Sequence, residues 1–147
     1  MKLRIIGVVY AAIAGATSTA PVLAQDVFVV RVTTVPISLA EAAATTGHGA
    51  ARGTLDGRTL VIDGRFDGLQ GAATRAELHI GSVRGVRGDA FAEIDVEPST
   101  AGTFTGRTEL QRAQVAALRE GRMYLQIHSV AAPEGNLWGW LLPAEVP

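Results

Sequence analysis

Three side chains with metal-binding chemistry stand out in the second half of the sequence. Glu77 and His79 are two residues apart in a segment that alternates apolar and polar residues, so both should leave the same face of a β-strand. His128 occupies a polar position in a later segment of the same kind. Two imidazoles and one carboxylate suit a divalent ion such as zinc, copper or iron. If the two strands are neighbours, the sequence predicts a metal site at Glu77, His79 and His128.

A second group of side chains suits the recognition of a partner by contact. Tyr124 and Gln126 share the predicted strand face of His128. Trp138 and Trp140 share a face of the last predicted strand. Exposed indole and phenol rings beside polar groups stack on sugars or pack against a partner protein. These four residues, without His128, form the candidate binding face for a protein or a glycan.

Both groups also have a structural interpretation, and the sequence leaves the alternatives open. The histidines His79 and His128 could form hydrogen bonds within the sheet and cap a partly exposed layer. The two tryptophans could cover the core from outside, beneath a loop at residues 131–136. His48 lies between glycines, so we expect its side chain to be solvated, although it could add a third imidazole.

Composition excludes several other chemistries. The 147 residues contain no cysteine, which removes thiol catalysis and thiolate metal sites. The formal net charge of −1 gives no electrostatic footprint for nucleic acid. No nucleophile-elbow motif G-x-S-x-G occurs, and the glycine-rich segment at residues 81–88 lacks the spacing of a phosphate loop. We therefore expect a non-enzymatic protein without a cofactor, unless the zinc or copper alternative holds.

The first residues have the organisation of a secretory signal peptide. Lys2 and Arg4 precede a short apolar stretch, which polar residues and a proline then interrupt. Small side chains stand before a cut after Ala24. The sequence thus predicts a signal peptide at residues 1–24 and a single domain at residues 25–147. We expect export to a periplasm or the medium, with no membrane insertion after cleavage.

The remaining sequence is typical of an all-β domain. Glycine and β-branched residues recur at short intervals, and polar and apolar residues alternate between them. Thr108 is expected to cap one short helix near residues 110–119, and Gly121 to end it. Residues 39–46 are predicted to form a loop. Strands are predicted at residues 28–33, 50–55, 60–66, 75–80, 92–96, around 104, 123–129 and 137–142.

Five segments match short motifs that occur together, in this order, in one family. The segments are GAARGTLDGRTL at 49–60, AELHIG at 76–81, LQRAQVAAL at 110–118, GRMYLQIHS at 121–129 and PEGNLWG at 133–139. The corresponding motifs are G-x-A-x-G-x-L-x-G-x-x-L, A-H-I-H-x-G, L-T-A-A-Q-V-A-A-L, G-x-x-Y-V-N-I-H-T and P-x-G-E-I-R-G. Over about residues 27–142 the chain therefore resembles the CHRD, or chordin-type, domain.

The resemblance implies an antiparallel Greek-key β-sandwich with one short helix, similar in shape to copper/zinc superoxide dismutase and immunoglobulin-like domains. Bacteria carry such domains alone, as exported proteins. Three positions depart from the family pattern: Glu77 replaces a histidine, Gln126 an asparagine and Trp138 an arginine. We expect an exported, non-enzymatic module that binds a protein or glycan in the cell envelope or outside the cell, with the metal site as the alternative function.

Overall fold

The computed structural model describes residues 25–34 and 39–144, so the predicted signal peptide at residues 1–24 lies outside the described residues. In chain order the elements are β1 (Asp26–Thr34), α1 (Leu39–Ala42), β2 (His48–Asp56), β3 (Thr59–Asp67), β4 (Ala73–Ile80), β5 (Ala90–Val96), β6 (Gly102–Glu109), α2 (Arg112–Arg119), β7 (Met123–Ser129), β8 (Leu137–Trp140) and β9 (Leu142–Pro143). Neither helix in the described ranges is long and apolar enough to cross a membrane.

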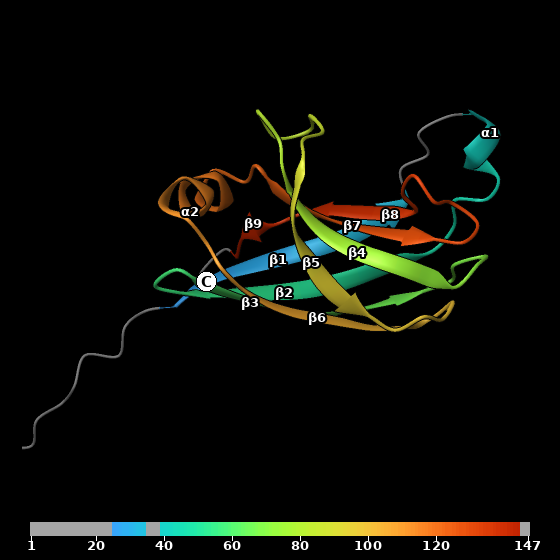
Figure 1. The fold of residues 1–147 in the computed structure, drawn as a ribbon, viewed down its shortest axis with the longest axis horizontal. Helices are drawn as coiled ribbons and strands as arrows, with labels where there is room; N and C mark the ends of the chain where they lie inside the picture. Colours follow the sequence, from blue (N-terminus) through green and yellow to red (C-terminus); the bar gives the residue numbers. More distant parts are fainter. Residues whose placement is uncertain (1–24, 35–38, 145–147) are drawn as a thin grey trace, which may run out of the picture.

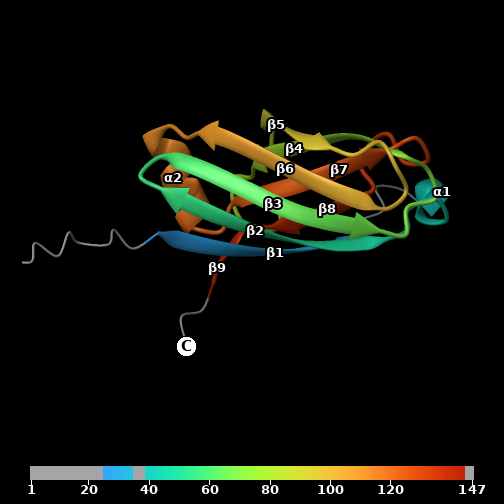
Figure 2. The ribbon, with the colours of Figure 1, turned by 90° about the horizontal axis from the view of Figure 1, so that it is seen from below.

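The strands form a closed eight-stranded antiparallel barrel (Figure 1, Figure 2). Around the barrel the order is β1-β2-β3-β6-β5-β4-β7-β8, and β8 pairs again with β1. The short strand β9 pairs with β1 further along. The predicted Greek-key β-sandwich is therefore wrong. The all-β class, the antiparallel pairing and the single short helix near residues 110–119 are confirmed, and a one-turn helix, α1, lies within the predicted loop at residues 39–46.

Strand β1 closes the barrel, because it pairs with β2 as well as with β8 and so joins the two ends of the strand order. One edge pairs with β2 from Asp26 to Thr33, and the other pairs with β8 and β9. An eight-stranded barrel is just wide enough for side chains to fill its interior. The alternation predicted from sequence places these side chains there, since Leu60, Ile62 and Leu78 are fully buried. The interior is therefore filled by apolar side chains.

The two helices lie at opposite ends of the barrel (Figure 1, Figure 2). Helix α2 covers one end with Val115 and Leu118, which belong to the core. The predicted cap at Thr108 is wrong, because this residue lies inside β6. Gln111 is the N-cap instead, and its backbone N–H donates to Oε1 of Gln114 at 2.7 Å.

Gly64 on β3 is packed against the core so closely that it has no space for a side chain. A Cβ atom there would overlap the ring of Phe104 and lie 2.7 Å from Cβ of Ala51. We predict that Gly64→Ala lowers the free energy of unfolding by about 2 kcal/mol, because overpacking forces neighbouring groups to shift. Urea denaturation measures this loss.

The matched control is Arg65→Ala, since Arg65 follows Gly64 and is exposed on the outer face of the same strand. Its free energy of unfolding should change by less than about 0.5 kcal/mol. Equal losses in the two variants would contradict the inward position of Gly64.

Candidate metal centre

Neighbouring strands bring all the predicted site residues onto one outer face of the barrel. Strand β7 lies between β4 and β8 (Figure 1). The paired positions are Glu77↔Gln126, His79↔Tyr124 and Arg75↔His128 between β4 and β7, and Gln126↔Trp138 and Tyr124↔Trp140 between β7 and β8. Strands β4 and β7 are therefore neighbours, as the predicted metal site at Glu77, His79 and His128 requires.

This outer face is covered rather than open. Tyr124, Gln126 and His128 are 1%, 4% and 4% exposed, although their side chains point away from the barrel core. Trp138 and Trp140 are half-buried. In this structure Tyr124 and Gln126 therefore present almost no surface to a partner, and only the two tryptophans of the predicted binding face do so.

The loop between β4 and β5 holds His79 in place. Nδ1 of His79 lies 3.0 Å from the backbone oxygen of Gly88. The hydroxyl of Tyr124 donates to the same oxygen and accepts from the N–H of Gly88, both at 3.1 Å. The rings of His79 and Tyr124 stack, with centroids 4.8 Å apart. A Cβ atom at Gly88 would overlap the backbone of Ile80, so this close approach requires glycine.

The loop between β7 and β8 holds His128 in the same manner. Nδ1 of His128 lies 2.8 Å from the backbone oxygen of Pro133. Next to it, Nε2 of Gln126 donates to the backbone oxygen of Glu134 at 2.8 Å. Each histidine is therefore oriented by a backbone carbonyl from a different loop.

These contacts determine which ring nitrogens carry the protons. A carbonyl oxygen only accepts hydrogen bonds, so each Nδ1 must be the protonated nitrogen, and in a neutral ring Nε2 then has a free lone pair. Both Nε2 atoms are buried and have no hydrogen-bond partner among the described residues. Oε2 of Glu77 lies 3.0 Å from Nε2 of His128 and 3.7 Å from Nε2 of His79. Lone pairs that face a carboxylate are unfavourable unless a proton or a metal ion lies between them.

The environment of His128 favours its neutral form. Burial lowers the pKa of its imidazole below the usual 6.5, and the positive charge of Arg75 acts in the same direction. The carbonyl of Pro133 and the carboxylate of Glu77 oppose this decrease in pKa without reversing it. His128 is therefore neutral at pH 7, which is the state that binds metals.

Arg75 supplies the positive charge beside Glu77 in this structure. Nε of Arg75 lies 3.2 Å from Oε2 of Glu77, and its side chain is 51% exposed whereas that of Glu77 is 14% exposed. Arg75 was not among the predicted site residues, although its spacing of two from Glu77 places both on one strand face. The carbonyls of Gly88 and Pro133 were not predicted either, because every residue has a carbonyl and residue type does not reveal which of them contacts a side chain.

The ligand atoms are close enough together for a metal ion. Among the described residues, ligand atoms of Glu77, His79 and His128 all lie within 4.8 Å of one another. Tetrahedral zinc holds its ligands at about 2.0–2.2 Å, which places them about 3.4 Å apart. The separations of 3.0 Å and 3.7 Å between Oε2 of Glu77 and the two Nε2 atoms lie close to this value. Three protein ligands leave a fourth position open. His48 is exposed on β2 and is not part of this group.

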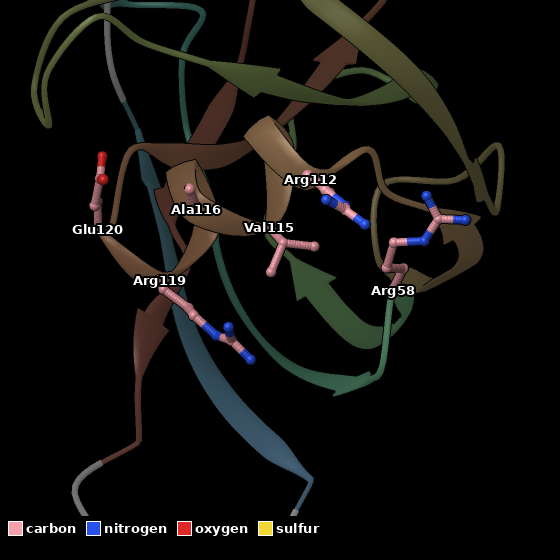
Figure 3. A pocket seen from close by; sticks show the side chains of 6 residues that line it. All are labelled: Arg58, Arg112, Val115, Ala116, Arg119 and Glu120. Carbon is pink, nitrogen blue, oxygen red and sulfur yellow. The ribbon is translucent and has the colours of Figure 1, made fainter.

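A separate pocket lies where α2 meets the turn between β2 and β3 (Figure 3). It is lined by Arg58, Arg112, Val115, Ala116, Arg119 and Glu120. Two of its arginines are already paired, Arg58 with Glu109 and Arg119 with Asp26. The pocket shares no residue with the candidate metal centre.

The comparison with known families agrees with the motifs. The family described as CHRD domain matches residues 31–141, which is most of the chain. The chain belongs to the CHRD domain family. The resemblance inferred from sequence is thereby confirmed, and the three candidate ligands lie within the matched part of this CHRD domain. No curated protein and no solved structure is significantly similar to the chain.

The lowered pKa of His128 makes the stability of the metal-free CHRD domain depend on pH. In the unfolded chain this imidazole takes up a proton near pH 6.5, whereas in the folded chain it does so at a lower pH. The unfolded state thus binds more protons in the interval between the two pKa values, so the free energy of unfolding falls as the pH decreases through it. We predict this fall between pH 7.5 and pH 5, measured by urea denaturation with a chelator present.

The His128→Gln variant should lose less stability over the same interval than the wild type. His48→Gln is the matched control, because His48 is exposed and outside the cluster, and its pH dependence should equal that of the wild type. An undiminished dependence in His128→Gln would assign the effect to other groups.

Proposed function

We propose that this CHRD domain binds one divalent transition-metal ion through Glu77, His79 and His128. The observation that carries the proposal is that the buried Nε2 atoms of His128 and His79 lie 3.0 Å and 3.7 Å from one oxygen of Glu77. A bound cation would turn this unfavourable contact into a favourable one. The set of ligands suits zinc, copper or iron.

The surroundings of the ligands also support the proposal. Metal-binding histidines typically donate their second ring N–H to a carbonyl or carboxylate, which fixes the tautomer and the ring orientation. The carbonyls of Gly88 and Pro133 have this role for His79 and His128. The protein's own carbonyls therefore hold both imidazoles in an orientation that suits metal binding. We assign binding alone to the site, and no reaction.

Binding of a protein or glycan partner is the second candidate. The half-buried rings of Trp138 and Trp140 support it, since they keep some exposed surface. The guanidinium of Arg87 lies over Trp138, 5.5 Å from the ring centroid, and adds a polar group beside the indole. We propose that either activity takes place outside the cytoplasm, on the strength of the predicted signal peptide.

Zinc is the appropriate first probe, because it has no redox chemistry. We predict that the purified protein, free of histidine-rich tags, binds one equivalent of zinc in isothermal titration calorimetry. Its melting temperature should rise, since a ligand that binds only the folded state at about 100 times its Kd stabilises that state by about 2.7 kcal/mol. Glu77→Gln, His79→Gln and His128→Gln should each weaken binding by about 100-fold or more, because even residues that only orient a ligand contribute 10–100-fold.

The chain offers a matched control in His48, the one histidine of its three that is not a proposed ligand. His48→Gln removes an exposed imidazole outside the cluster, so it should leave the stoichiometry and Kd unchanged. Zinc binding that survives His79→Gln and His128→Gln but is lost in His48→Gln would refute the assignment. A melting temperature that does not respond to zinc, copper or iron would refute metal binding itself.

A further inference from the structure

One oxygen atom of Glu77 is shared by three nitrogen atoms. Oε2 lies 3.2 Å from Nε of Arg75, 3.0 Å from Nε2 of His128 and 3.7 Å from Nε2 of His79. Arg75 is the one group of the three that brings a permanent positive charge, because a guanidinium is always protonated. Arg75 therefore occupies the place of counter-ion to Glu77 in the metal-free site.

A metal ion bound by the two Nε2 atoms would have to take the same oxygen. Arg75 competes with that ion in two ways, because it holds the oxygen by an ion pair and repels a second cation nearby. Once the metal has taken the oxygen, the guanidinium loses its partner. The site then contains a divalent ion, one carboxylate and one arginine, which leaves an excess of two positive charges.

We propose that the metal-loaded site binds a small anion between the open metal position and the guanidinium of Arg75, an inference that rests on the proposed metal binding. The anion would reduce the excess to one positive charge and give Arg75 a new partner. Arginine suits this task, since its guanidinium is always charged and presents several N–H donors in one plane. The ligand class is a small monoanion, such as a carboxylate or an inorganic anion.

Accessibility is consistent with this position for the anion. The side chains of His79 and His128 are 11% and 6% exposed, whereas that of Arg75 is 51% exposed. A small anion can therefore reach the site from the side of Arg75.

The competing partner for a freed guanidinium is Glu93, which stands opposite Glu77 on β5 and is exposed. A turn of Arg75 toward Glu93 would make the anion unnecessary.

The first test measures zinc affinity at pH 8 by calorimetry, in perchlorate, which coordinates metals weakly. Arg75→Gln removes the competing charge and should tighten zinc binding by about tenfold, the size of effect that one nearby charge has on a binding equilibrium. Arg75→Lys retains the charge and should stay within about threefold of the wild type. Arg107→Gln, an exposed arginine on β6, is the control and should leave the Kd unchanged. Weaker zinc binding in Arg75→Gln would overturn the role of Arg75 as a competitor.

The second test replaces perchlorate by azide or acetate at the same ionic strength. In the wild type each anion should tighten zinc binding by about fivefold or more, and by reciprocity zinc should tighten anion binding equally. Azide should also change the visible spectrum of the cobalt(II)-loaded protein. In Arg75→Gln the tightening should disappear, while Glu93→Gln should retain it.

The outcomes separate the two proposals. Zinc binding that is independent of azide and acetate, or equally dependent on them in wild type and Arg75→Gln, overturns the anion site and leaves the metal site intact. Absence of zinc binding in all variants overturns the metal site itself. Melting curves without metal confirm that each variant is folded, so that a loss of binding is not a loss of structure.

Discussion

Strand β7 is buried on both of its faces, and the candidate metal centre depends on this constraint. Its inward residues Met123, Leu125 and Ile127 belong to the core, while its outward residues Tyr124, Gln126 and His128 are covered as well. Buried polar groups need hydrogen-bond partners. Because the neighbouring strands use their backbone groups to pair with β7, the partners of these side chains come from loops. The strand and the two loops over it therefore form one structural unit.

The two loops act through backbone carbonyls, which accept hydrogen bonds but do not donate them. The carbonyls of Gly88 and Pro133 bind the Nδ1 atoms of His79 and His128, so that the Nε2 atoms face Glu77. In the absence of a cation, this arrangement places electron pairs against a carboxylate. Arg75 reduces the resulting imbalance from the exposed side. The same geometry would favour a bound cation.

Membership of the CHRD domain family accounts for the order of the sequence motifs along the chain. The ligand set has a feature of its own, because Glu77 stands where the family motif has a histidine. A carboxylate and an imidazole are both good ligands for transition metals, but only the carboxylate brings a negative charge. That charge is what makes Arg75 a natural neighbour of the site, since a third imidazole would have no need of a counter-ion.

The sequence by itself determined the all-β class and identified which residues could form the site. Alternating residues indicated the strands and their inward faces, and the spacing of Glu77, His79 and His128 identified the possible ligands, because a period of two places such residues on one side of a strand. Only the tertiary structure decided that the strands close into a barrel instead of packing as a sandwich, since alternation gives the face of a strand but not its neighbours. It also decided that loops cover Tyr124 and Gln126 and that Arg75, Gly88 and Pro133 complete the site. Gly88 lies 36 residues from Tyr124 in the chain, and backbone carbonyls leave no trace in residue type.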